Sequence, residues 1–417
     1  MNEVVDSLAF LYKEEDLSYY DGEFFSKELD FRDSEKQFRM FYDFGTKSSL
    51  IVDLNLTDRS YHSMSLLFLG NIIRQKMGLD CGIYINRKVF PFQYYWAILC
   101  SYHDAGYGIE NGDIKTTNAI ISHNIKKKTG LLFEKTYVNS LFKFNYLYRR
   151  KFRNNYSIFS GFKNRNMKRI SDDINNYFNG ENNHVIDNED YEIKVGNIIV
   201  RDSQYSFKLI DDYFYFREDY MNVIDHGIIG GMLLFDRFIE LYQKKYFDNI
   251  NLDFNKRYHS NFTYFMCDDY HEACIEQFPL FAYLADCIVS HNVFLPTEES
   301  LPVYKKYNID ALKNKQIDYA KNPLLYLLCF VDTIDPVKFF MNKYNGNYPI
   351  NEILNSIGLE VDDKQKTITI SKIESGFIKN PDHFKEYINK ILELNDFLKI
   401  KIERKDDNNC TVYWDKQ

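Results

Sequence analysis

Apolar positions recur at helical spacing in several separate stretches of this chain. Between Tyr61 and Lys76 they follow one another at intervals of three and four residues, which predicts an amphipathic helix. The residues that carry this pattern are Leu66, Leu69, Ile72 and Ile73. A second helix is predicted for Phe92–Tyr102, because Pro91 directly precedes an apolar run and proline is favoured at a helix start.

Three later stretches carry the same helical signal. They are residues 221–246, 269–291 and 323–334, and Pro279 is expected to divide the second of them into two helices. Strand-like stretches differ from these by their short runs of β-branched residues. We expect strands at 47–53, 191–200 and 366–373, and a hairpin over 397–413 that turns near Asp407, with a helix at 381–394 before it.

The order of these elements predicts a mainly α protein. An N-terminal segment covers 1–54, a helical core covers 55–340, and a small α+β appendage covers 345–417. Residues from about 110 to 220 are rich in Asn and in basic side chains, so we interpret them as an α+β lobe inserted into the core or lying beside it. We find no internal repeat.

Composition narrows the class of protein further. The 417 residues include 45% hydrophobic side chains, which is enough for a large buried core. Met1–Phe10 lacks the pattern of a secretory leader, no apolar run approaches the roughly 20 residues that cross a bilayer, and the seven cysteines form no CxxC pair. We therefore expect a cytoplasmic protein with free thiols and without contact to a membrane.

The net charge of −8 argues against a general nucleic-acid-binding surface. The segment 147–169 is the local exception, because it combines many Lys and Arg residues with aromatic ones. We favour a solvated surface there over a binding site. The chain also contains no GxxxxGK[ST], GxSxG or helix-opening GxGxxG motif, which weighs against kinases, serine hydrolases and dinucleotide-dependent enzymes.

Histidines and aspartates stand within or at the ends of the predicted apolar helices. A single histidine in such a place is more often a hydrogen-bonded core residue than a ligand. Together, however, their imidazole nitrogens and carboxylate oxygens form a ligand set for Mn, Fe, Co, Ni or Zn. The residues are His62, His103, Asp104, His226, His291 and Asp332.

The order His, His-Asp, Asp in a mainly helical chain resembles the HD superfamily of metal-dependent phosphohydrolases over roughly 55–340. The resemblance implies that His62, His103, Asp104 and Asp332 hold one divalent ion. This ion would be Mn, Fe, Mg, Co, Ni or Zn. Asp335 is the alternative final ligand, since it lies three residues after Asp332 on the same helical face. We prefer Asp332 because Pro336 directly follows Asp335.

Three local motifs resemble the deoxynucleoside triphosphate triphosphohydrolases of that superfamily. In DRSYHSMSL, Arg59 precedes His62 by three residues, and the resemblance implies that it contacts substrate phosphate. HDAGYG (103–108) resembles their HD-x-G-H-G pattern, with Tyr107 in the place of a histidine beside the substrate. DHGIIGG (225–231) resembles their His-Glu-x-Gly helix, which implies that His226 is a catalytic acid or an additional ligand, although Gly227 replaces the glutamate. The resemblance places His226 and Asp104 in the catalytic machinery.

His291 supports a second interpretation. It ends an apolar helix as a ligand does in HD phosphodiesterases with two metals, so that His226 and His291 would hold a second ion. Three hypotheses therefore stay open: a triphosphohydrolase acting on deoxynucleoside triphosphates, a binuclear phosphodiesterase acting on cyclic or linear nucleotides, and a nucleotide sensor without turnover. The resemblance further implies one or two ions per chain, a nucleotide activator and a homo-oligomer. Lys305 and Lys306, between His291 and Asp332, are candidates for contact with substrate phosphates.

Overall fold

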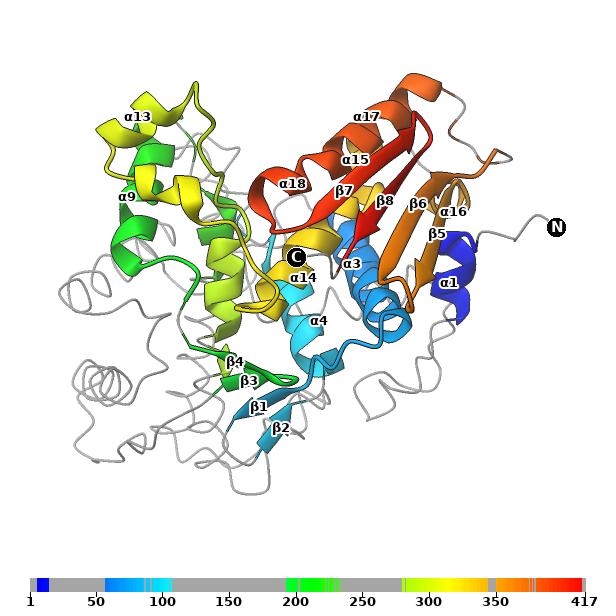
Figure 1. The fold of residues 1–417 in the computed structure, drawn as a ribbon, viewed down its shortest axis with the longest axis horizontal. Helices are drawn as coiled ribbons and strands as arrows, with labels where there is room; N and C mark the ends of the chain where they lie inside the picture. Colours follow the sequence, from blue (N-terminus) through cyan, green and yellow to red (C-terminus); the bar gives the residue numbers. More distant parts are fainter. Residues whose placement is uncertain are drawn as a thin grey trace, which may run out of the picture.

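The computed structural model describes residues 6–14, 57–106, 193–234, 280–343 and 350–414, apart from a few positions inside these ranges. Figure 1 shows the helices and strands of this part of the chain. The helices are α1 (Leu8–Glu14), α3 (Thr57–Lys76), α4 (Phe92–Tyr102), α9 (Phe207–Asp219), α13 (Leu301–Lys306), the 3-10 helix η2 (Asp310–Asn314), α14 (Pro323–Ile334), α15 (Pro336–Lys343), α16 (Ile350–Asn355), α17 (Pro381–Leu392) and α18 (Leu394–Phe397). Helical residues also occur between 226 and 234 and between 280 and 290.

Three helices predicted from apolar spacing form the centre of the fold. α4 and α14 have the predicted bounds, and α3 extends the first predicted helix by four residues at its start. α14 begins where the Asn322 side chain accepts a hydrogen bond from the Leu325 N–H and Pro323 occupies the first turn. Because ten of its twelve residues are buried, α14 is the central helix of the core.

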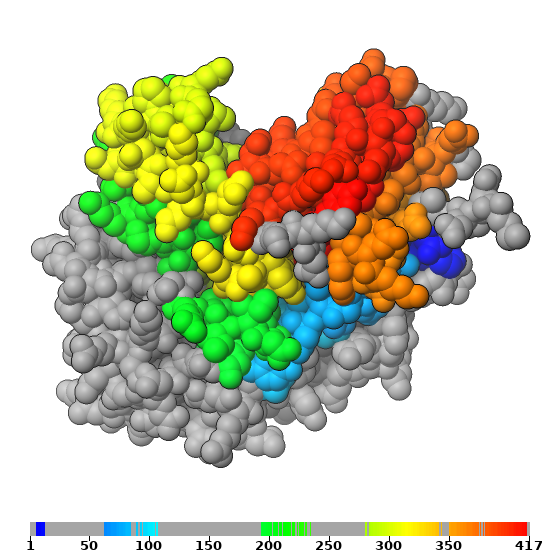
Figure 2. Space-filling view, in the orientation of Figure 1, coloured from blue at the N-terminus to red at the C-terminus, as the bar shows by residue number. Residues whose placement is uncertain are grey.

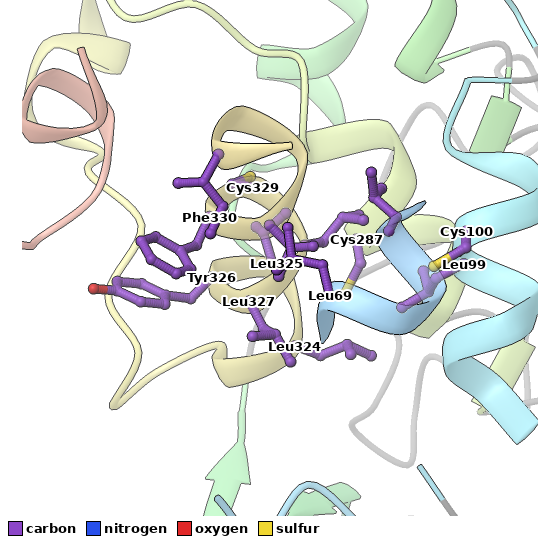
Figure 3. Close-up of a cluster of buried hydrophobic side chains, with 14 of the residues drawn as sticks. Leu69, Leu99, Cys100, Cys287, Leu324, Leu325, Tyr326, Leu327, Cys329 and Phe330 are labelled. Carbon is purple, nitrogen blue, oxygen red and sulfur yellow. The ribbon is translucent and has the colours of Figure 1, made fainter. Parts of the chain in front are cut away.

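Figure 3 shows how the central helices meet. One buried hydrophobic cluster contains Leu69 of α3, Leu99 of α4, Leu325 of α14, and Cys287 from the helical residues between 280 and 290. Gly70 lets α3 approach α4 closely, because a Cβ at this position would lie 2.4 Å from the Trp96 ring. This close packing fixes the ends of the helices relative to one another, and the polar residues of interest stand at those ends.

A small antiparallel sheet flanks α4. Its strands are β1 (Ile83–Ile85), β2 (Lys88–Phe90), β3 (Ile193–Val195) and β4 (Ile198–Val200), in the order β2-β1-β3-β4. The single strand expected at 191–200 is therefore a hairpin, because Gly196 with φ +56° reverses the chain. β3 pairs with β1, so the last part of the stretch interpreted as an insertion joins a sheet with residues that precede α4.

The C-terminal residues form a second antiparallel sheet. Its strands are β5 (Ile357–Asp362), β6 (Thr367–Lys372), β7 (Lys401–Asp406) and β8 (Asn409–Tyr413), in the order β5-β6-β8-β7. The predicted strand at 366–373, the predicted hairpin and the helix before it are confirmed as β6, as β7 with β8, and as α17. β5 was not predicted.

The second sheet and α17 pack against the back of α14. The Tyr387 hydroxyl of α17 donates to the carbonyl of Ile334, and the Trp414 ring packs edge-on against Tyr326 and Phe330. In Figure 2 this C-terminal unit and the region of α13 form separate protrusions on the visible face. The C-terminal unit thus packs against α14 and contacts its last residue, Ile334.

Several predicted features lie outside the described residues. These are the strand at 47–53, the basic segment 147–169, Pro279 and most of the helix at 221–246. Within the part of the chain that the structure covers, no helix combines the length and the apolarity that crossing a membrane requires. The described residues are thus mainly helical, with two small antiparallel sheets.

Candidate metal centre

Five separate segments place the predicted histidines and aspartates in one buried cluster. His62 lies inside α3, and His103 and Asp104 directly follow α4, where the His103 N–H still donates to the carbonyl of Leu99 at 2.9 Å. Asp332 lies in the last turn of α14. The two other members are His226, at the start of a helical turn, and His291, directly after the helical residues that end at 290.

The first triad consists of His62, His103 and Asp332. The Nε2 atom of His62 lies 3.1 Å from Nε2 of His103 and 2.9 Å from Oδ1 of Asp332, and His103 Nε2 lies 3.7 Å from the same oxygen. Two imidazole nitrogens and a carboxylate oxygen therefore converge within the 4.8 Å spread that one ion can bridge.

The second triad consists of Asp104, His226 and His291, whose candidate ligand atoms also lie within 4.8 Å of one another. Asp104 links the two triads. One of its oxygens lies 3.4 Å from His103 Nε2 and 3.5 Å from His226 Nε2, and the other lies 3.6 Å from His62 Nε2. A carboxylate in this position can bind one ion or bridge two.

Three of the four histidines direct Nε2 to the cluster as an acceptor, because their Nδ1 atoms donate hydrogen bonds elsewhere. Nδ1 of His62 bonds to Asp335 Oδ2 at 2.6 Å, Nδ1 of His103 to the carbonyl of Cys100 at 3.0 Å, and Nδ1 of His291 to the carbonyl of Ile288 at 2.6 Å. Each oxygen accepts, so each Nδ1 carries a proton and each neutral ring keeps a lone pair on Nε2.

His291 Nε2 provides the observation that tests the fit of a metal. This atom is buried and has no hydrogen-bond partner among the described residues. Burial, together with the neighbouring His226 and His103, lowers the pKa of His291 to about 3, so its Nε2 lone pair is available throughout the neutral range. A buried lone pair without a donor is costly unless an ion or a ligand meets it, so the cluster fits a divalent metal.

The carboxylates of the cluster are ionised. Burial opposes their charged form, but the Lys338 ammonium and the histidines outweigh it. The pKa of Asp104 is lowered most by the His103 ring and next by Lys338, and the pKa of Asp332 is lowered most by Lys338. Both pKa values therefore lie well below the usual range of a carboxyl group. Deprotonated carboxylates and neutral imidazoles are the forms that bind metal.

His62 is the member whose proton competes with metal. Burial and Lys338 favour the neutral ring, but the hydrogen bonds to Asp332 and Asp335 outweigh them and raise the pKa of His62 above 6.5. Without metal, the protonated ring stabilises the fold below the unfolded pKa of about 6.5, and this contribution is lost as the pH rises through the folded pKa.

We therefore expect metal uptake at about pH 6 to release about one proton per chain from His62, and the affinity to fall by about tenfold for each pH unit below the folded pKa of His62. Asp104 and Asp332 release none above about pH 4, because their pKa values are lowered. Titration calorimetry with Mn²⁺ in two buffers of different ionisation enthalpy measures this proton directly. If the observed uptake enthalpy, before any correction for buffer ionisation, were equal in both buffers, no proton would be released and the assignment of His62 as a ligand would be contradicted.

Two residues beside the cluster have contacts that the sequence pattern did not predict. Asp335 was considered as a ligand in place of Asp332, but its carboxylate lies behind His62, where it also accepts hydrogen bonds from the Ser65 hydroxyl and the Val337 and Lys338 N–H groups. Lys338 of α15 was not considered, and its Nζ lies 2.7 Å from Asp332 Oδ1. Only the fold reveals both roles, since α15 begins directly after Asp335.

Replacing Asp335 with asparagine is expected to weaken metal binding by about 10–100-fold, the usual effect of losing a carboxylate that orients a histidine ligand. Asparagine is itself a good helix cap, so the start of α15 should persist. Equilibrium dialysis with Mn²⁺ measures the affinity, and thermal melting of the metal-free variant controls for the fold. A variant with unchanged affinity would show that Asp335 only caps the helix.

Glycines let the segment that carries His226 approach its neighbours. A Cβ on Gly230 would lie 2.4 Å from the carbonyl oxygen of Tyr102, and one on Gly231 would lie 2.6 Å from that of Ala285. A Cβ on Gly106 would lie 2.3 Å from the carbonyl oxygen of His226. Gly230 and Gly231 therefore let this segment pack closely against its neighbours, and Gly106 allows the loop after α4 to approach His226.

The other predicted site residues either lie outside the described residues or stand on a different helix. Arg59 lies in α3 one turn before His62, but its side chain and the whole of Tyr107 lie outside the described residues. Lys305 and Lys306 lie exposed on α13, where Nζ of Lys306 lies 5.3 Å from the Tyr307 ring centroid. Figure 1 shows α13 beside α9 and apart from α3 and α4, so contact of these lysines with a substrate stays a prediction.

Comparison with known proteins adds no family to this geometry. No protein-family model, no curated protein and no solved structure matches the chain.

Proposed function

We propose that this protein is a metal-dependent phosphohydrolase that acts on nucleotides. The observation that carries the proposal is the pair of His/Asp triads joined by Asp104, in which three histidines keep a lone pair directed at the cluster. Imidazole and carboxylate ligands at the ends of rigid helices form the type of site at which phosphate esters are hydrolysed.

His62, His103 and Asp332 would hold the first ion, with Asp104 beside them. A divalent ion bound there supplies Lewis acidity towards phosphate oxygens and lowers the pKa of a water molecule. Asp104 would orient that water, because its Oδ1 atom lies between Nε2 of His103 and Nε2 of His226. The Lys338 ammonium, about a quarter exposed next to Asp332, balances the charge of an incoming phosphate.

For the substrate, the local motifs favour a deoxynucleoside triphosphate. Arg59 would add a second cation one helical turn before His62. Water would attack the α-phosphorus, and the bond from phosphorus to the 5′ oxygen would break. The products are the deoxynucleoside, whose 5′ oxygen gains a proton, and inorganic triphosphate.

The position of His291 favours a second candidate. Its Nε2 lone pair lies in one triad with Asp104 and His226, which supports a second ion and hence a phosphodiesterase acting on cyclic or linear nucleotides. The distinction lies in which phosphorus–oxygen bond is broken, so products separate the candidates more clearly than a metal count does.

The experiment is a hydrolysis panel with Mn²⁺, Mg²⁺, Co²⁺, Ni²⁺, Fe²⁺ and Zn²⁺, in which mass spectrometry identifies the products. Deoxynucleoside triphosphates, alone and in mixtures, and cyclic and linear dinucleotides form the panel. Release of triphosphate supports the first candidate, and cleavage of a diester supports the second. His103→Ala with Asp104→Ala is the control, since an enzyme loses turnover in this variant whereas a metal-independent sensor keeps nucleotide binding. Absence of any hydrolysis would contradict the proposal.

A further inference from the structure

His226 differs from the other histidines of the cluster in what its ring meets. Its Nδ1 atom lies 3.3 Å from the side-chain nitrogen of Asn292, whereas Nδ1 of each other histidine in the cluster meets an oxygen. Because hydrogen bonding at one ring nitrogen decides the state of the other, this contact determines the chemistry of His226.

The orientation of the Asn292 amide is fixed by Asp225. Asp225 is fully buried beside the Arg217 guanidinium, whose Nε lies 3.5 Å away, and its Oδ1 accepts from the Ile228 N–H at 2.9 Å. A carboxylate accepts only, so the group that Asn292 places 2.8 Å from Asp225 Oδ2 must be its NH₂ group. The second hydrogen of that NH₂ group is then directed at His226.

Because Asn292 donates a hydrogen bond to Nδ1 of His226, this nitrogen must be the acceptor and carries no proton. His226 is then neutral, with its proton on Nε2, the atom that lies 3.5 Å from Asp104 Oδ1. An Nε2–H group has no lone pair for a metal, because that nitrogen already carries a proton. This leaves hydrogen-bond donation as the chemistry available to His226.

We propose that Asn292 is a positioning residue that holds His226 as a neutral Nε2–H donor directed at the phosphoryl group of the substrate. His226 is then neither a ligand of a second ion nor the acid that protonates the leaving oxygen. This role of His226 rests on the proposed function. The Nε2–H group stabilises the charge that develops on a phosphoryl oxygen during attack by water. Arg217 and Asp225 act only by orienting Asn292.

The first test reads the tautomer and needs no substrate. In metal-free protein with ¹⁵N-labelled histidine, His226 is assigned by its absence in His226→Gln, and its ring shifts report which nitrogen carries the proton. We expect the proton on Nε2 in the wild type. In Asn292→Asp we expect it on Nδ1, because the new carboxylate accepts. A wild-type proton on Nδ1, or an unchanged tautomer in Asn292→Asp, would overturn the inference. Asn308→Asp, which makes the same change of charge at an exposed position, should have no effect.

The second test separates the three roles of His226. His226→Ala should lower kcat by about 10²–10³-fold, the usual effect of losing one donor to developing charge. The loss should be equal for a nucleotide ester with a p-nitrophenol leaving group, which needs no proton, and for one with a ribose leaving group. Mn²⁺ content should not change. Loss of Mn²⁺ would identify a ligand, and a loss confined to the ribose leaving group would identify a proton-transferring acid; either result overturns the inference.

Asn292→Ala, combined with His226→Ala, tests whether Asn292 acts through His226. The double variant should hydrolyse no more slowly than His226→Ala alone, because the two residues form one unit. Additive losses would overturn the inference. If the wild type hydrolyses no ester at all, the proposed function fails, and the tautomer measurement still decides the assignment of Asn292.

Discussion

Asp104→Asn is expected to remove metal binding and to lower nucleotide hydrolysis by roughly 10³-fold or more, since a bound ion contributes several kcal/mol to the stabilisation of the transition state. Asp104 faces His62, His103 and His226, so it is the member that joins both triads. Asparagine keeps its shape but removes the charge on which an ion depends. Elemental analysis of the protein after Mn²⁺ loading and gel filtration, together with kcat, measures both effects.

Asp286→Asn is the matched control for this variant. Asp286 is also a fully buried carboxyl, but it stands outside the cluster, and burial raises its pKa well above the usual range. Asparagine therefore resembles the neutral acid that is already present. The control should retain both Mn²⁺ and turnover. Equal behaviour of the two variants, with metal retained or lost in both, would contradict a specific role of Asp104.

Gly106→Ala is expected to lower kcat by about 10²-fold, because a shift of about 1 Å in a catalytic group can have an effect of this size. A Cβ at Gly106 would lie 2.3 Å from the carbonyl oxygen and 2.7 Å from Cα of His226. Both are backbone atoms, which yield less readily than the end of a side chain, so the segment with His226 and the loop after α4 must move apart. Overpacking of this kind should also destabilise the fold by about 1–3 kcal/mol.

Gly82→Ala provides the comparison for that variant. A Cβ there would lie 3.3 Å from the Tyr84 side chain, which can yield, and its nearest atoms belong to Tyr84 and Asp80 rather than to the residues of the cluster. Its kcat should match the wild type, and its unfolding midpoint in urea should change little. If Gly106→Ala also retained wild-type turnover, the contact between the loop after α4 and His226 would have no role in positioning.

The central helices could be predicted because their apolar residues alone determine them. α14 is apolar at nearly every position and begins with Asn-Pro, so both its burial and its start are visible in the sequence. The same helices carry His62, His103 and Asp332 at or near their ends, so the cluster could be anticipated without a structure. β1 and β2, with three residues each, were missed because such short strands show no alternating pattern.

The division of roles among the polar residues could not be read from spacing. Asp332 and Asp335 share a helical face, and only the position of His62 between their side chains separates a ligand oxygen from an orienting one. Asn292 and Lys338 belong to no motif. Their roles depend on which atoms the folded chain brings to His226 and to Asp332, and these contacts join residues that lie far apart in the sequence or on successive helices.

The most direct measurement of the metal centre is anomalous diffraction from crystals soaked in Mn²⁺. The structure predicts an anomalous peak bounded by Nε2 of His62, Nε2 of His103 and Oδ1 of Asp332, at the distances of about 2.0–2.2 Å that transition-metal ligands adopt. A crystal saturated with Mn²⁺ that shows no peak between these three atoms would contradict the assignment of the cluster as a metal centre, and with it the proposed hydrolysis of nucleotides.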